Sequence, residues 1–256
     1  NCHGRYSGRA SVTINASIMV QNKLSETQPP KAPKLLHTLH MHGQTLIDQW
    51  HWLKDLEDPS TLNYLSAENN YTDTIMAPTS DLQTSLYTEM RNRIKEDDSS
   101  VPQTLGEYLY HTKYNEGSEY PIHCRKHISP DGEEEIILDI NELSINKSYL
   151  RIGFVKVSPD HKFLAYSSDE NGSESFKIYV KDLTSGTLLS DEITGAYYSF
   201  AWANDSTTFF YTTLDINHRP VRVRRHNLGS APETDETIYE ERDSRFFVGV
   251  TKSASK

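Results

Sequence analysis

A repeat of 45 residues in the second half of the chain constrains the fold more than any other feature. Shifting the sequence by 45 positions, without a gap, aligns apolar and turn residues with residues of the same kind. The aligned pairs are Val157 with Trp202, Asp160 with Asp205, Leu164 with Phe209, Tyr166 with Tyr211, Ile178 with Val223, Leu183 with Leu228 and Ile193 with Ile238. An earlier, looser copy has a shift of 56, which aligns Glu107 with Phe163 and Ile122 with Ile178. Units of 40–45 residues with four strands each are typical of β-propeller blades.

Short alternating segments separated by turn residues support this interpretation. Turns are expected at residues 129–132, 158–160 and 204–206, because Asn, Asp, Pro and Gly favour them. The predicted strands are Glu107–Lys113, Tyr120–Lys126, Glu135–Asp139, Gly153–Val157, Phe163–Ser168, Phe176–Lys181, Thr187–Leu189, Ser199–Trp202, Thr208–Thr213, Val221–His226, Thr237–Glu240 and Arg245–Val250. A meandering β-sandwich is the alternative. About three blades fit into residues 105–256, whereas a closed propeller needs at least four, so we expect a piece of a longer protein.

The region before the repeats is predicted to be helical. Asp58-Pro59-Ser60 is a helix start, since Asp58 can cap free N–H groups and proline is tolerated at the first helical position. Pro78 is expected to end this helix. A second helix is expected from Ser80, where Ser80 and Gln83 match a capping box. Its apolar residues form one stripe that must pack on another part of the protein: Leu82, Leu86, Met90 and Ile94.

Residues 1–30 are predicted to be a disordered leader and linker. Residues 1–18 combine arginine with serine and threonine, and no acidic residue occurs before position 26, as in a transit-like segment. The favoured interpretation is a misassigned leader ahead of a true start at Met19. Pro29, Pro30 and Pro33 then predict an extended linker.

Composition excludes several classes of protein. The net charge of −10 argues against nucleic acid as a partner, because phosphate binding needs a basic surface. No apolar run approaches 18 residues, so we expect no membrane span. Cys2 and Cys124 are too few for a disulfide framework or a four-ligand zinc site. They fit a reducing compartment, and we expect a cytoplasmic protein.

Motif searches yield no active site. The chain has no Gly-x-Ser-x-Gly, phosphate loop, dinucleotide fingerprint or His-Glu-x-x-His. Three weaker patterns, a histidine cluster, a segment like a calcium loop and a basic run, each have a structural explanation. An extended segment accounts for His37, His40 and His42, a hairpin turn for residues 169–172, and the solvated face of a strand for Arg222, Arg224, Arg225 and His226. We predict no catalytic, cofactor-binding or metal-binding residue in these 256 positions, and no cofactor.

Several longer segments are more specific than these patterns. They are Leu39-His40-Met41-His42-Gly43, Asp48-Gln49-Trp50-His51-Trp52-Leu53-Lys54-Asp55, residues 93–102 (RIKEDDSSVP), Glu119-Tyr120-Pro121-Ile122, residues 200–206 (FAWANDS) and Ile238-Tyr239-Glu240-Glu241. From about Pro30 to the last residue, the chain resembles the amino-terminal part of the prolyl oligopeptidase family of serine peptidases, in its oligopeptidase B branch.

The resemblance implies a mainly β chain with amino-terminal helices, which holds the first three or so blades of a seven-bladed propeller. Residues 31–98 would pack on a carboxy-terminal α/β-hydrolase domain that this chain lacks, and Ile94–Pro102 would be a hinge strand. Residues 99–256 would be the partial propeller, which restricts access to short peptides. The Ser–Asp–His triad would lie beyond Lys256, as would most of the acidic residues that bind Lys or Arg, and this chain alone would be inactive. The alternative is a stand-alone β-repeat module that binds protein partners without enzymatic activity.

Overall fold

The computed structural model describes residues 28–253 and divides the chain into two compact units. The first unit extends to Ile94 and the second begins at Lys95. Residues 1–27, which hold most of the expected leader and linker of residues 1–30, lie outside the described part. No helix within residues 28–253 has the length and apolar character needed to cross a bilayer.

The first unit begins with a β-hairpin that sequence analysis did not predict. Strands β1 (His37–Met41) and β2 (Gln44–Asp48) pair antiparallel around His42 and Gly43. These two residues have φ angles of 51° and 75°. A two-residue turn with both residues in the left-handed region matches the natural twist of a hairpin. A short 3-10 helix, η1 (His51–Lys54), follows.

Helix α2 (Pro59–Met76) begins where it was predicted. The Asp58 carboxylate accepts a hydrogen bond from the Ser60 N–H at 2.7 Å, which satisfies one of the free donors of the first turn. The predicted capping box at Ser80 is wrong. A 3-10 turn, η2 (Ala77–Thr79), keeps the chain helical through Pro78, so Ser80 is already inside helix α3 (Ser80–Arg91). Gln83 Nε2 instead donates to Thr79 Oγ1 at 2.7 Å.

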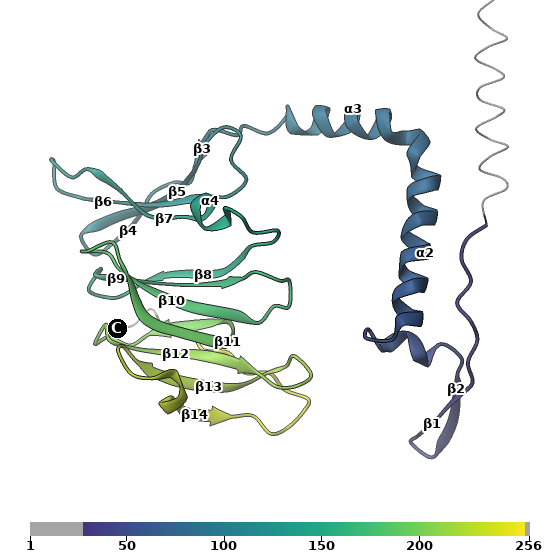
Figure 1. The fold of residues 1–256 in the computed structure, drawn as a ribbon. Helices are drawn as coiled ribbons and strands as arrows, with labels where there is room; N and C mark the ends of the chain where they lie inside the picture. Colours follow the sequence, from purple (N-terminus) through teal and green to yellow (C-terminus); the bar gives the residue numbers. More distant parts are fainter. Residues whose placement is uncertain (1–27, 254–256) are drawn as a thin grey trace, which may run out of the picture. The chain divides into compact units, whose positions relative to one another are not determined.

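Helix α3 and the residues after it carry an apolar surface that solvent reaches. We call it the α3 stripe, and its members are 48% to 64% exposed: Leu82, Leu86, Met90 and Ile94. The two helices meet at a bend in η2 (Figure 1). The stripe therefore has the spacing of a buried helix face without the burial.

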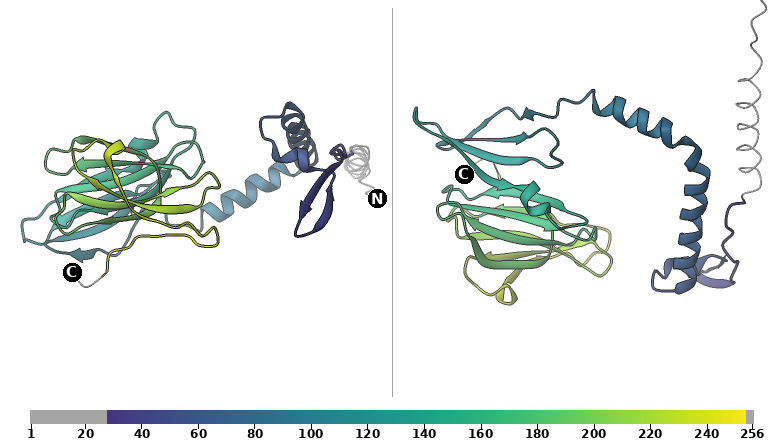
Figure 2. Two further views of the ribbon diagram at one scale, coloured as in Figure 1. Left: turned by 90° about the horizontal axis from the view of Figure 1, so that it is seen from below. Right: turned by 45° about the horizontal axis from the view of Figure 1, so that its top comes forward.

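The second unit consists of two antiparallel sheets. The first contains β3 (Asp98–Ser99), β4 (Gln103–Leu105), β5 (Tyr108–Tyr114), β6 (Ile122–His127) and β7 (Glu134–Asp139), and is followed by the short helix α4 (Ile140–Ser144). The second contains β8 (Arg151–Val157), β9 (Phe163–Asp169), β10 (Phe176–Asp182), β11 (Leu188–Trp202), β12 (Thr208–Leu214), β13 (Pro220–Asn227) and β14 (Glu236–Glu240), with the 3-10 turn η3 (Pro232–Thr234) before β14. Figures 1 and 2 show the strands of this unit stacked in layers.

The long strand β11 joins two blades. Its first part pairs with β10, where Ile193 lies opposite Ile178, and its second part pairs with β12, where Phe200 lies opposite Tyr211. Blade 1 is therefore β3–β7, blade 2 runs from β8 to the first part of β11, and blade 3 runs from the second part of β11 to β14. Two strands that were predicted separately, at 187–189 and 199–202, are one continuous strand.

Register confirms the 45-residue repeat. Leu164 lies opposite Lys181 in blade 2, and Phe209 lies opposite His226 in blade 3, so both partners move by the same 45 positions. Leu164 and Phe209 are both fully buried. A large apolar side chain at this position stabilises the fold by about 1.5–3 kcal/mol through burial.

The earlier copy aligns with a shift of 55, and the predicted shift of 56 is wrong by one residue. Lys113 pairs with Ile122 in blade 1, as Ser168 pairs with Lys177 in blade 2. The turn residues support the shift of 55, because Gly106, His161 and Ser206 have φ angles of 58°, 62° and 62° at equivalent positions. A one-residue error exchanges the two faces of every strand, so this correction decides which side chains are equivalent.

Two apolar clusters hold the blades together. One joins blades 1 and 2 through Ile137, Leu138, Ile140, Leu150, Leu164 and Tyr166. The other joins blades 2 and 3 and includes Phe154, Ile178, Val180, Phe200, Trp202 and Phe209. The predicted strand Arg245–Val250 is wrong, because this segment has no ladder partner among the described residues. Val248 N–H bonds to Pro220 O at 2.9 Å, whereas Phe246 N–H bonds locally to Asp243 O at 3.1 Å.

Candidate functional site

The three amino-terminal histidines do not converge. The His37 ring stacks on His51, with centroids 3.7 Å apart, while His40 Nδ1 contacts Thr45 Oγ1 at 3.1 Å. His42 is in the hairpin turn. The extended-segment interpretation agrees with this geometry.

The acidic loop after β9 is a hairpin turn, as predicted. Asp169 is 1% exposed, and its carboxylate accepts backbone N–H groups from Asn171, Gly172 and Glu174 at 2.8–3.0 Å. Burial acts to raise the pKa of Asp169, but these hydrogen bonds to the charged form outweigh burial, so the pKa lies below its ordinary value. The carboxylate oxygens are thus committed to the protein's own backbone.

We expect Asp169→Asn to lower the free energy of unfolding by about 2 kcal/mol at pH 7, because the amide loses the charge and one acceptor oxygen. A carboxyl group with a lowered folded pKa contributes stability above its unfolded pKa of about 3.9. That contribution disappears as the pH falls through the folded pKa, so the variant and the natural protein converge in acid. Urea unfolding between pH 7 and pH 2 measures this. A difference that does not depend on pH, or an equal loss for the exposed neighbour Glu170→Gln, would contradict the prediction.

The basic run on β13 is paired with neighbouring acidic groups. Arg222 Nε lies 2.8 Å from Glu240, and Arg225 Nη2 lies 2.6 Å from Glu236. Arg224 Nη2 donates to the backbone oxygen of Asp235 at 2.7 Å. The contacts of Arg222 and Arg225 are the cross-strand ion pairs of a sheet surface, whereas that of Arg224 is a hydrogen bond to the backbone. Including His226 in the solvated face was wrong, because it is fully buried.

His226 lies between two buried carboxylates that come from different blades. Its Nδ1 is 2.7 Å from Asp235 Oδ1 and its Nε2 is 2.9 Å from Asp191 Oδ1. Asp191 also accepts the Gly229 N–H at 2.6 Å, and Tyr211 donates its hydroxyl to Asp235 at 2.7 Å. Burial and then the bond to Asp235 raise the pKa of Tyr211. We call these groups the His226 network, and its full set of partners gives it a structural role.

A serine, a histidine and a carboxylate also meet at the end of β6. Ser129 Oγ lies 2.8 Å from His127 Nδ1, and Glu107 lies 3.8 Å from His127 Nε2. The same Nδ1 accepts the Ser129 backbone N–H at 3.1 Å, and the Glu107 side chain is 81% exposed. A catalytic triad needs a base that is free to accept the hydroxyl proton and a buried carboxylate that orients it. The arrangement is therefore a turn cap.

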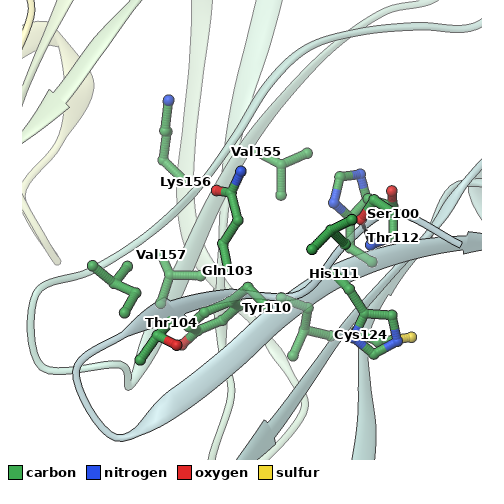
Figure 3. A pocket seen from close by; sticks show the side chains of 14 residues that line it. Ser100, Gln103, Thr104, Tyr110, His111, Thr112, Cys124, Val155, Lys156 and Val157 are labelled. Atoms are coloured by element: carbon green, nitrogen blue, oxygen red, sulfur yellow. Dashed lines mark hydrogen bonds between the residues drawn. The ribbon is translucent and has the colours of Figure 1, made fainter.

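The two larger cavities of the second unit lie next to its β-strands. One, of about 510 Å³, is between blades 1 and 2, and Figure 3 shows Gln103, Tyr110 and Lys156 around it. The other, of about 590 Å³, is bordered by His161, Trp202 and residues 251–253. Neither lining includes an aspartate or glutamate among the described residues. These cavities thus provide no carboxylate for a cationic side chain.

Known proteins account for this architecture. Residues 30–256 match the N-terminal β-propeller domain of prolyl oligopeptidase. Protease 2 of Moraxella lacunata is 35% identical over 233 residues, which cover 88% of this chain and 34% of the relative. Dipeptidyl aminopeptidase BI of Pseudoxanthomonas mexicana is 35% identical over 262 residues, which cover 95% of this chain and 36% of the relative. The chain therefore spans about a third of the length of these relatives.

Solved structures of the same family are similar to this chain over most of its length. Oligopeptidase B from Leishmania major superposes with a TM-score of 0.79 at 30% identity, over 85% of this chain and 33% of that protein. The closed form of oligopeptidase B from Trypanosoma brucei with covalently bound antipain gives a TM-score of 0.80 at 30% identity, over 88% and 34%. Fold and sequence agree, so this chain belongs to the prolyl oligopeptidase family and carries the first blades of its N-terminal β-propeller.

Proposed function

We propose that this chain is the amino-terminal part of a serine peptidase like oligopeptidase B, which hydrolyses short peptides after Lys or Arg. The main support is the similarity to two oligopeptidase B structures, with TM-scores of 0.79 and 0.80 over 85% and 88% of the chain. The net charge of −10 also favours the approach of cationic peptides. The two larger cavities are lined by no carboxylate among residues 28–253, and most of the pocket for the basic side chain would lie outside this chain.

The roles that we propose for the two parts of this chain are those that its family membership implies. Residues 31–98, after a leader of residues 1–30, would pack on a carboxy-terminal α/β-hydrolase domain that supplies the Ser–Asp–His triad. Residues 99–256 would begin the propeller that controls which peptides reach the triad. None of the residues in this chain would be catalytic. The exposed α3 stripe supports a docking role, because its spacing is that of a helix face buried in the intact protein.

We also propose a cytoplasmic location. Cys124 is a free, buried thiol, and reduced cysteines of this kind are common where disulfides do not persist. A reducing compartment would keep it in this state.

A comparison of peptide amides tests the proposed specificity. The full-length protein is assayed with amino-blocked substrates that end in Arg, Lys or Ala before the cleaved bond. We expect kcat/KM to be at least about 100-fold higher for Arg and Lys than for Ala, since a buried carboxylate without its cationic partner costs transition-state binding. Equal rates for the three substrates would contradict the specificity, and no hydrolysis at all would favour the non-enzymatic binding module.

The relative from Pseudoxanthomonas mexicana suggests a second candidate function, the removal of dipeptides from free amino termini. Its identity of 35% equals that of Protease 2, and it covers more of this chain. The same Arg substrates with and without an amino-terminal block distinguish the two activities. Rapid cleavage of only the unblocked dipeptide would favour this second candidate.

A further inference from the structure

The face of blade 1 that points away from blade 2 carries an unusual cross-strand pair. His111 on β5 lies directly opposite Cys124 on β6. The equivalent pairs are Tyr166 with Tyr179 in blade 2, shifted by 55, and Tyr211 with Arg224 in blade 3, shifted by a further 45. Blade 2 fills this position with stacked aromatic rings, 5.4 Å between centroids. Blade 1 instead has two side chains that ligate transition metals.

A third ligand completes the group from the next strand. Glu134, the first residue of β7, brings its carboxylate to within 2.9 Å of His111 Nε2. One ligand atom from each of His111, Cys124 and Glu134 lies within 4.8 Å of the other two. Figure 3 shows His111 and Cys124 close together. We call this group the blade 1 triad.

The surroundings of the blade 1 triad suit a bound cation with an open position. Cys124 is 1% exposed, and its Sγ lies 4.0 Å from Ile122 O and within 4.8 Å of a Glu134 carboxylate oxygen. The His111 side chain is 13% exposed and that of Glu134 is 39% exposed, so the group is open to solvent on the glutamate side. Lys113 forms an ion pair with the other carboxylate oxygen, Oε1, which leaves Oε2 turned toward His111.

We propose that His111, Cys124 and Glu134 bind a zinc ion in blade 1. Imidazole nitrogen, thiolate sulfur and carboxylate oxygen are the ligands zinc takes in tetrahedral sites, and water would occupy the fourth position on the exposed side. Binding transfers the thiol proton to solvent, and coordination through His111 Nε2 places the imidazole proton on Nδ1. Tetrahedral coordination needs about 3.3 Å between nitrogen and oxygen, so His111 and Glu134 separate by a few tenths of an ångström. Lys113 keeps Oε1 and orients the carboxylate.

Cobalt binding to the metal-free, full-length protein tests this site, because Co²⁺ takes the place of Zn²⁺ and absorbs light. We expect one equivalent of Co²⁺ to give a thiolate-to-cobalt band in the near ultraviolet and strong visible bands of a tetrahedral ion. Zinc should abolish both. Cys124→Ser should remove the thiolate band, and His111→Gln and Glu134→Gln should each weaken binding by at least about 100-fold, more than the loss of an outer partner.

Two matched variants control for other sites. His127→Gln removes a histidine on β6, the strand of Cys124, that is more exposed than His111. Cys2→Ser removes the other cysteine of this chain. Both variants should leave the cobalt spectrum unchanged. Circular dichroism checks that the Cys124→Ser variant is folded. A spectrum without the thiolate band, or a band that persists in folded Cys124→Ser, would overturn the proposal.

Discussion

Replacing His226 by alanine is expected to lower the free energy of unfolding of the second unit by about 3–5 kcal/mol, because two buried carboxyl groups each lose a hydrogen-bond partner and the imidazole leaves an unfilled space. His226 is fully buried, and both ring nitrogens lie within 2.9 Å of a carboxylate oxygen. The substitution leaves Asp191 and Asp235 inside the protein without their shared partner. Because Asp191 belongs to blade 2 and Asp235 to blade 3, the loss should loosen the contact between blades.

Urea unfolding at pH 7 measures this effect, and two further variants identify its cause. Arg225→Ala, one residue away on the same strand, removes an exposed ion pair with Glu236 and should cost no more than about 1 kcal/mol. Adding Asp191→Asn to His226→Ala should restore part of the stability, because it removes one unpaired charge while keeping an acceptor for the Gly229 N–H. A loss as small as that of Arg225→Ala would show that the network is not what joins the blades.

The β-repeat could be predicted from sequence because each blade uses the same positions for the same purpose. Tyr166 and Tyr211 are both buried, and Asp160 and Asp205 both accept hydrogen bonds within the turn that follows a blade's first strand. Because such local features recur at a fixed spacing, the repeat can be found by aligning the sequence with itself. The shift of 56 failed since matching Ile122 to Ile178 maximised apolar agreement but ignored the face on which each side chain lies.

Functional groups that depend on pairing between strands could not be predicted in this way. His111, Cys124 and Glu134 are separated by 13 and 10 positions along the chain, without a recognised metal-ligand spacing. Only the register of β5, β6 and β7 brings them together. His226 was likewise assigned to the solvated face because its neighbours are arginines, whereas its burial depends on Asp191 from the preceding blade. Cross-strand neighbours require the register, and a single sequence determines it only approximately.

The second large effect is expected at the α3 stripe, and it rests on the proposed docking to a hydrolase domain. Leu86 is 48% exposed in this chain but would be buried in the intact protein. Leu86→Asp should weaken the docked state by at least about 3 kcal/mol, since it removes the burial of a leucine and places a carboxylate in an apolar contact. Thermal unfolding of the full-length protein, together with its rate of proteolysis between residues 92 and 102, measures the loss.

Thr88→Asp is the matched control for this experiment. It adds the same charge two positions further along α3, about 200° around the helix axis, where the side chain points away from the stripe. A surface substitution there should change stability by no more than about 0.5 kcal/mol. If Leu86→Asp and Thr88→Asp had equal effects, the stripe would be an ordinary solvent-exposed helix face. A loss confined to Leu86→Asp would instead mean that the first unit gains its stability from a domain that packs on it.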